Sequence, residues 1–333
     1  MNDKDIEQVL KSAGPREKPS VDFERMVHSR LRAEWLGLVA DNRRHRRRRT
    51  VLALAASVVA AAIGIWIAAP RLTGPADAIA TMALTAGEVR MKSGWFDGWH
   101  EIVEGQPLLT GQTLATGPSG RGALALPGGV SARLDHDTRL TIAGAEELTL
   151  DRGALYVDSG PAAVPSSRLD VITPSGSVRH IGSQYEVRVM GNEVRLRVRE
   201  GQVEWRARTG AIERSRTGVQ LTIAGDGTVK RVSIPLYGES WDWIAATAPG
   251  IEIEGLPLGR FLSWVGRELG REITYASPQS ESEVAGIVVH GSISGLTPAQ
   301  ALNAVLATTT VRAVIADGRI VVGSQERVFK LAD

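Results

Sequence analysis

The chain contains no cysteine among its 333 residues. This absence excludes disulfide bonds, zinc sites built from thiolates and cysteine nucleophiles, so the folded part must be held together by its hydrophobic core. No serine lies in a Gly-x-Ser-x-Gly nucleophile elbow, and neither the ligand spacing of a metal site nor a phosphate-binding loop is present. These absences predict a protein that is not an enzyme and that carries no metal or cofactor.

Charged residues are also absent from residues 50–69 (TVLALAASVVAAAIGIWIAA), which contain no Asn, Gln or Pro either. Twenty helical residues span about 30 Å, the thickness of the hydrocarbon core of a membrane, so the run predicts one transmembrane helix. A cluster of arginines directly precedes it: Arg43, Arg44, Arg46, Arg47, Arg48 and Arg49. The positive-inside rule then predicts a cytoplasmic N-terminus and an exported C-terminal part.

Two other interpretations of residues 50–69 are weaker. A cleaved signal peptide has a short basic region and an apolar run of roughly 7–15 residues, whereas here 49 residues precede a longer run. The residues Ala68, Ala69 and Pro70 would form a poor cleavage site. A buried core helix would need a polar outer face, which this run does not have.

The basic residues are concentrated in the N-terminal segment. Residues 1–49 carry a net charge of +5 and the rest of the chain a net charge of −3. Next to a membrane, such a basic stretch indicates a topology signal and contact with anionic lipids. A nucleic-acid surface would instead spread basic residues with aromatics over a folded domain, so no direct binding of nucleic acid is expected.

The N-terminal segment is predicted to contain one amphipathic helix. Ser20 is a suitable N-cap, and large apolar residues follow at nearly every fourth position: Phe23, Val27, Leu31, Trp35 and Leu38. A segment of 49 residues is too short for a core of its own, so this stripe needs a partner. The partner is either another protein or the lipid surface, and the pattern alone favours neither.

Residues 80–232 show short alternating segments separated by glycine, which predict an all-β domain. The clearest part, residues 185–205, is predicted to be a three-strand meander with turns at residues 191–192 and 200–201. The intervening polar positions are expected to face solvent, among them Arg188, Arg195, Arg197 and Arg199.

Two groups in the sequence could carry binding chemistry. Asp135, His136 and Asp137 could be read as a metal cluster, but adjacent strand residues point to opposite faces, which favours a polar turn or solvated edge. Four tryptophans could stack on sugars, although packing in a core or an interface is the more common role. They are Trp95, Trp99, Trp241 and Trp243.

Residues 233–333 change to a helical period and predict a small α+β domain. Apolar residues at helical spacing over 258–269 precede Gly270, which suits the end of a helix. Thr297 to Gln300 (TPAQ) forms a capping box that opens a second helix. Strands are expected over 271–275 and 287–293, and a final hairpin is expected to turn at Asp317 and Gly318.

The β-domain contains an ordered set of short motifs. They include residues 87–89 (GEV), 105–108 (GQPL), 111–114 (GQTL), 133–140 (RLDHDTRL), 150–153 (LDRG), 178–187 (VRHIGSQYEV) and 198–203 (VREGQV). Their order resembles that in the FecR domain, the periplasmic β-domain of iron-transport regulators. In that family the domain sits just outside a single span. The resemblance implies a bacterial inner-membrane protein whose C-terminal domains are periplasmic.

The C-terminal domain also contains an ordered set of motifs, at residues 256–258 (LPL), 273–275 (ITY), 291–293 (GSI), 298–302 (PAQAL) and 318–322 (GRIVV). Over residues 251–323 this order resembles the short N-terminal domain of secretins and TonB-dependent receptors, the STN domain. It implies a role in protein–protein contact, with no chemistry.

Together these features predict a mainly β fold with a small α+β domain. The expected parts are a cytoplasmic tail at 1–49, a transmembrane helix at 50–69, the FecR-like domain at 80–232 and the STN-like domain at 233–333. The resemblance implies a relay from a TonB-dependent receptor or other envelope protein to an extracytoplasmic-function sigma factor. The alternative is a membrane-anchored periplasmic binding or scaffold protein.

Overall fold

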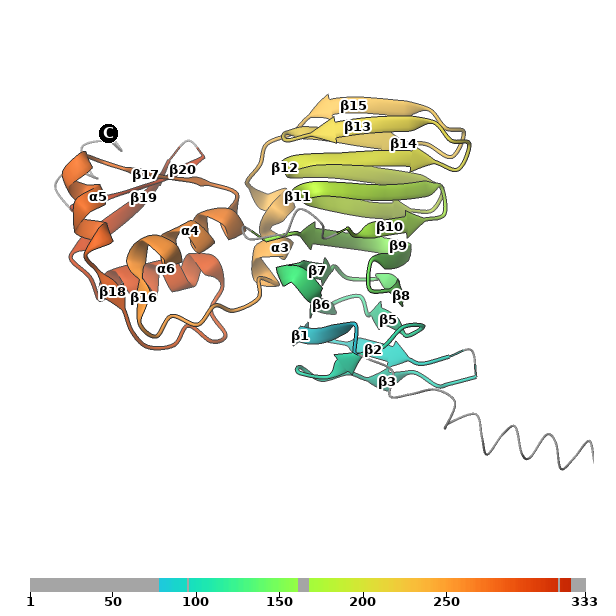
Figure 1. Cartoon of the computed structure of the whole chain (residues 1–333), viewed down its shortest axis with the longest axis horizontal. Coiled ribbons are helices and arrows are strands. Elements are labelled where there is room, and N and C mark those ends of the chain that lie inside the picture. Colours follow the sequence, from blue (N-terminus) through green and yellow to red (C-terminus); the bar gives the residue numbers. More distant parts are fainter. Residues whose placement is uncertain (1–77, 95, 161–167, 317, 325–333) are drawn as a thin grey trace, which may run out of the picture. The chain divides into compact units, whose positions relative to one another are not determined.

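A computed structural model describes residues 78–94, 96–160, 168–316 and 318–324 (Figure 1). Residues 76–333 form one compact unit. The predicted cytoplasmic helix and transmembrane helix lie outside the described residues. Within the described part of the chain, no helix is both long enough and apolar enough to cross a membrane.

One sheet of fifteen strands fills the first part of the described chain. Its strands are β1 (Ala80–Ala86), β2 (Val89–Lys92), β3 (His100–Glu101), β4 (Pro107–Leu108), β5 (Thr113–Thr116), β6 (Arg121–Ala125), β7 (Ser131–Leu134), β8 (Arg139–Gly144), β9 (Glu147–Asp158), β10 (Asp170–Thr173), β11 (Gly176–Met190), β12 (Glu193–Ala207), β13 (Ile212–Arg216), β14 (Val219–Ile223) and β15 (Val229–Ser233). A short 3₁₀ turn, η1 (Pro127–Gly129), separates β6 from β7. The prediction of a mainly β chain is confirmed.

The main path through the sheet runs β15-β14-β12-β11-β10-β9-β7-β6-β1-β4. Most neighbours are antiparallel, and β10 pairs with β9 in the parallel direction. In Figure 1 the strands lie above one another, from β3 to β15.

The long hairpin β11–β12 corrects the predicted meander. Its two strands have fifteen residues each and pair along their whole length, so the chain does not turn at residues 200–201. Instead the register shifts between Ile181 and Tyr185, opposite Gly201. Gly201 has φ +80°, and a Cβ there would lie 2.3 Å from the carbonyl oxygen of Gly182. Two residues of β11, Gly182 and Ser183, therefore lie opposite the single residue Gly201, which is a β-bulge and not a turn.

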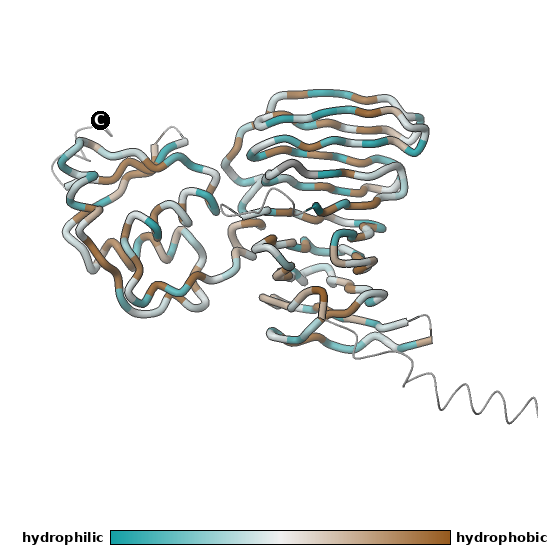
Figure 2. Tube along the Cα trace, viewed as in Figure 1, coloured by the Kyte–Doolittle hydropathy of each residue, from teal (hydrophilic) through white to brown (hydrophobic). Residues whose placement is uncertain are grey.

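Alternation along β11 and β12 separates the two faces of the sheet, as Figure 2 shows by its alternating brown and teal positions. One face supplies the core, with Tyr185, Val187, Leu196 and Val198 fully buried. Period-two alternation in a half-buried sheet predicts this placement, and it is confirmed. The opposite face of the same strands is polar.

The second part of the described chain is α+β. Its elements are the 3₁₀ turn η2 (Glu239–Trp241), α3 (Asp242–Ala246), β16 (Leu256–Pro257), α4 (Leu258–Leu269), β17 (Glu272–Tyr275), α5 (Pro278–Ala285), β18 (Val288–Val289), α6 (Pro298–Ala307), β19 (Val311–Ala316) and β20 (Arg319–Ser324). β20 lies between β17, to which it is parallel, and β19, to which it is antiparallel. A second core packs α4 and α6 against this sheet, through residues such as Phe261, Leu262, Leu302 and Val322.

The local signals in this part are confirmed. Gly270 is left-handed at the C-cap of α4, with φ +63°, and Thr297 and Gln300 form both hydrogen bonds of the capping box. Two predictions needed correction. The strand expected over 287–293 is only Val288–Val289, and the helix α5 was missed because its sequence, PQSESEVA, has little apolar periodicity.

Candidate functional site

The polar face of the sheet is covered where it meets η2, α3 and the end of α4. A row of side chains in register crosses four strand pairings on this face: Arg133 on β7, Tyr156 on β9, Glu186 on β11, Arg197 on β12 and Gln220 on β14. Tyr156 packs with Trp241 and Ile244 in a small apolar cluster. We call the contact between this face and η2, α3 and α4 the junction.

The junction overturns one expectation. The arginines on this face were predicted to be solvated, yet Arg197 and Arg199 are only 5% and 3% exposed. Arg188 and Arg195 are partly covered as well. The prediction was wrong because alternation only separates the two faces of a strand, and the covering helical segment begins at Glu239, after the last strand of the sheet.

The deepest contact in the junction is a buried ion pair between Arg133 and Glu268. Two parallel hydrogen bonds of 2.7 and 2.9 Å join the guanidinium to the carboxylate, and Arg133 also donates to the carbonyl oxygen of Ile244 at 2.9 Å. Burial alone would lower the pKa of Arg133, but the charge and hydrogen bonds of Glu268 outweigh it and raise that pKa. This pair ties β7 to both α3 and α4.

A second ion pair lies beside the first. Arg267 on α4 forms a two-pronged hydrogen bond with Asp158 at the end of β9 and contacts Glu200 at 2.7 Å. Burial would raise the pKa of Asp158, but Arg267 lowers it, with further help from the amide of Gln184 at 2.8 Å. The last turn of α4 is therefore fixed to the sheet by consecutive residues of opposite charge, Arg267 and Glu268.

Trp241 is the aromatic centre of the junction and is only 1% exposed. The Arg197 guanidinium lies 3.9 Å from its ring centroid, and its indole N–H donates to the carbonyl oxygen of Pro235 at 2.9 Å. Arg199 donates to the carbonyl oxygens of Leu236 and Glu268, at 2.8 and 3.0 Å. A cation at the last carbonyls of α4 also complements the dipole of that helix.

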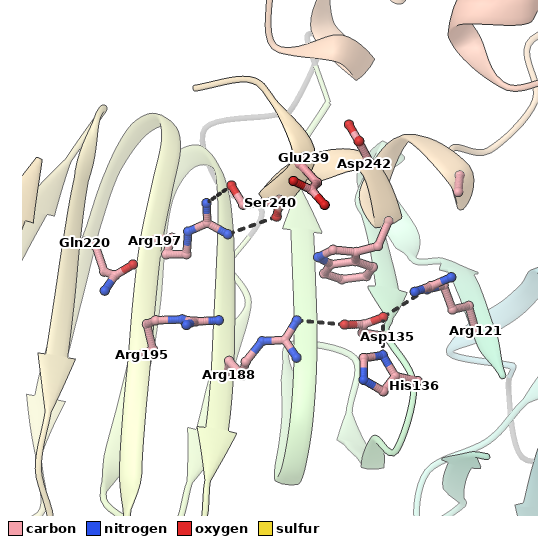
Figure 3. A pocket seen from close by; sticks show the side chains of 12 residues that line it. Arg121, Asp135, His136, Arg188, Arg195, Arg197, Gln220, Glu239, Ser240 and Asp242 are labelled. Carbon is pink, nitrogen blue, oxygen red and sulfur yellow. Dashed lines mark hydrogen bonds and ion pairs between the residues drawn. The ribbon is translucent and has the colours of Figure 1, made fainter. Parts of the chain in front are cut away.

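A groove opens next to these contacts, with a volume of about 670 Å³ (Figure 3). Asp135 lies on its wall with a buried side chain. It accepts hydrogen bonds from Arg121 at 2.9 Å and Arg188 at 2.7 Å, and it contacts Nδ1 of His136 at 2.9 Å. Burial would raise the pKa of Asp135, but these partners lower it to about 2.

Asp135 and His136 therefore line the groove, whereas Asp137 does not. Asp137 lies in a tight turn with φ +50°, and Asp135 points to the arginines. Among the described residues, no group of three acidic or histidine side chains could hold a metal ion. The polar turn expected here is confirmed. Asp135 is nevertheless buried rather than solvated, because its arginine partners come from β6 and β11.

We expect Asp135 to make the stability of the protein depend on acid pH. Because its pKa is about 2 in the folded state and 3.8 in the unfolded chain, its contribution is complete above pH 4 and is lost as the pH falls toward 2. A shift of this size corresponds to about 2 kcal/mol. Urea unfolding of the wild type and of Asp135→Asn at pH 6 and pH 3 measures the difference, which should shrink at the lower pH.

The control for this prediction is Asp170→Asn. Asp170 pairs with Arg179 on the surface and leaves the groove intact. This variant should keep the pH dependence of the wild type. An equal gap between wild type and Asp135→Asn at both pH values would contradict the assignment.

The structure does not describe the predicted site residues of the N-terminal segment. The stripe Phe23, Val27, Leu31, Trp35 and Leu38 lies outside the described residues, as do Arg43, Arg44, Arg46, Arg47, Arg48 and Arg49. Of the tryptophans, Trp241 packs in the junction, Trp243 lines the groove and Trp99 is half-buried between Lys92 and Arg139. Packing in a core or an interface, and not stacking on sugars, was the role that the sequence analysis favoured for these tryptophans.

Comparison with known proteins finds a family match for the central part of the sheet. Residues 112–204 match the family model described as FecR protein. This segment is similar to the FecR domain. The match runs from the residue before β5 into β12 and includes Arg133, Glu186 and Arg197 of the junction. The FecR resemblance seen in the sequence is thus confirmed, while the STN resemblance of the C-terminal module stays a prediction.

Two crystal structures are similar to this chain. Both are of a proposed anti-sigma factor from Parabacteroides distasonis ATCC 8503, at 2.50 and 1.65 Å resolution. Each is 16% identical in sequence to this chain and has a TM-score of 0.35. The match covers 64% of this chain, 98% of the first crystallised chain and 99% of the second. Similarity at this level supports no statement about function. No curated protein matches the chain.

Sequence reasoning missed the junction, although one signal for it was present. The strands carry both signs of charge on the same face, with Glu186 and Arg188 on one strand and Arg195 and Arg197 on the next. Opposite charges paired on adjacent strands are consistent with a covered polar face, but they also stabilise a solvated one, so this signal does not decide between the two.

Proposed function

We propose that this chain is a FecR-type regulator of the bacterial inner membrane. In this proposal it crosses the membrane once, with the N-terminus in the cytoplasm and residues from about 71 onward in the periplasm. It relays a signal from outside to an extracytoplasmic-function sigma factor, and it has no catalytic function. The observation that carries the proposal is the FecR match at residues 112–204, C-terminal to the uncharged run at 50–69.

The C-terminal module is the proposed receiver. Its expected partner is the signalling domain of a TonB-dependent receptor or another envelope protein. Support comes from the junction, because buried charge pairs tie the last turn of α4 to three strands of the FecR sheet. A force or shape change in the module therefore acts on the sheet through groups that cannot separate without exposing unpaired charges.

The cytoplasmic tail is the proposed output. Its stripe at Phe23, Val27, Leu31, Trp35 and Leu38 would dock on the sigma factor, and the arginine cluster at 43–49 would hold the tail inside. The other candidate, an anchored envelope scaffold, would need only the membrane span and would leave the stripe without a protein partner.

We expect protease added to spheroplasts to digest the C-terminal part and spare the tail. The reason is the charge asymmetry around residues 50–69, with six arginines on one side and Arg71 on the other. Tags at both ends of the full chain report the outcome on an immunoblot. Permeabilised cells, in which both tags should disappear, are the control. Loss of the N-terminal tag with survival of the C-terminal one would contradict the topology.

A further inference from the structure

We propose that the groove beside the junction is a binding site for a small molecule carrying an oxyanion, a carboxylate or a phosphate, and that Arg195 is its principal contact. The site lies on the FecR sheet and is independent of the membrane topology and of the sigma partner. Figure 3 shows Arg188, Arg195 and Arg197 extending from the sheet toward the groove, with the helical segment on the other side.

The first argument is the pairing of like charges across two strands. Arg188 on β11 and Arg195 on β12 are directly opposite each other in the antiparallel register. Like charges at such a position repel and destabilise a sheet unless a negative charge lies between them. Glu186 is the shared acid, but it contacts Arg188 at 3.2 Å, Arg195 at 3.5 Å and Arg197 at 3.3 Å. One carboxylate therefore serves three guanidinium groups.

The second argument is that Arg195 lacks the partners its neighbours have. Arg188 also donates to Asp135 at 2.7 Å, and Arg197 also donates to Ser240 Oγ at 2.7 Å. Within the described residues Arg195 makes no hydrogen bond, and its buried Nε has no partner. A buried donor left unpaired costs free energy, and an oxyanion offers the two acceptors that a guanidinium binds in parallel.

The third argument is the balance of charge in the groove. The strand side carries four arginines and two buried acids: Arg121, Arg188, Arg195, Arg197, Asp135 and Glu186. Two positive charges are left over there. Burial lowers the pKa of Arg197, and the neighbouring arginines lower it further although Glu186 opposes them, which agrees with this excess.

The opposite wall limits where the anion can sit. Glu239 and Asp242 line it and are exposed to water, so an anion is repelled from that side and drawn to the strand side. His136 is close to Asp135 and away from Arg195 in Figure 3. The oxyanion therefore seats at Arg195, next to the side chain of Gln220.

The size of the groove points to a small molecule as the ligand. Its volume of about 670 Å³ lies within the range of ligand pockets, about 300–1,000 Å³, and far exceeds a single oxyanion. Trp243 and Ala246 give part of the wall an apolar character, suited to the body of an organic ligand. The expected ligand thus combines an oxyanion head with an uncharged body.

The test is calorimetric titration of the full chain in a neutral detergent with two probes, sodium phosphate and sodium benzoate, at constant ionic strength. We expect saturable binding of at least one probe, and the probe that binds more tightly identifies the head group as phosphate or carboxylate. Arg195→Gln should weaken that binding about tenfold or more, because a charge-assisted hydrogen-bonded contact is lost. The matched control is Arg214→Gln, an exposed arginine on β13, which should bind as the wild type does.

A second variant distinguishes loss of binding from misfolding. Ala246 lies at the exposed end of α3 on the groove, so Ala246→Glu adds a carboxylate at the mouth without altering the buried contacts. It should also weaken binding, with an unchanged unfolding midpoint. Absence of saturable binding of both probes to the wild type would overturn the proposal. So would equal affinity in the wild type and both groove variants.

Discussion

Glu268→Gln is expected to destabilise the protein by about 3–5 kcal/mol, the cost of leaving one partner of a buried ion pair without its counter-charge. Arg133 is 1% exposed, so solvent cannot readily replace the lost carboxylate. Urea unfolding of the full chain in detergent measures the effect. Arg179→Gln, which breaks a surface pair with Asp170, should change stability by less than about 1 kcal/mol.

The double variant Arg133→Met with Glu268→Leu separates the charge from the packing. Replacing both partners by apolar residues of similar size is often neutral, so we expect most of the lost stability to return. A double variant as unstable as Glu268→Gln alone would mean that the geometry of the hydrogen bonds, rather than an unpaired buried charge, determines the cost.

The same pair of variants reports on signalling. If the junction transmits the signal, Glu268→Gln should abolish the induced response of a reporter gene under the cognate promoter. The double variant restores the contact surface without the paired charges. A normal induced response in Glu268→Gln, at wild-type protein level, would show that the signal does not pass through the end of α4.

Local patterns in the sequence predicted much of the fold. The helix at 258–269 was predictable because its apolar spacing, the left-handed glycine and the following strand are all encoded within residues 258–275. The hairpin β11–β12 was predictable in its faces but not in its length. Glycine is typical of both turns and β-bulges, so Gly201 alone does not show which of the two forms. Only the pairing with β11 decides between them.

The junction could not be predicted from local patterns. Arg133 and Glu268 are 135 residues apart, and Arg267 and Asp158 are 109 apart. A charged residue on the polar face of a strand is exposed by default, and it becomes buried only when a distant segment covers it. Spacing within one strand carries no information about that segment, so the paired groups were assigned to solvent.

Leu31→Glu is expected to abolish the complex between the tail and a sigma factor while leaving membrane insertion intact. Leu31 is at the centre of the predicted stripe, and the substitution places a charge in the middle of an apolar contact. An uncompensated charge in an interface costs about 2–5 kcal/mol, which is about a thirtyfold to several-thousandfold loss of affinity. Ala33→Glu adds the same charge off the stripe and should leave the complex unchanged.

Co-purification of the full chain from its own cells, solubilised in a neutral detergent, is the most direct measurement of the central claim. Mass spectrometry of the co-purified proteins then shows whether an RNA polymerase sigma subunit is among them. Our account predicts a sigma subunit with the wild type and with Ala33→Glu, and none with Leu31→Glu. Absence of any sigma subunit from the wild type, or equal recovery with Leu31→Glu, would contradict it and favour a helix that lies on the lipid surface.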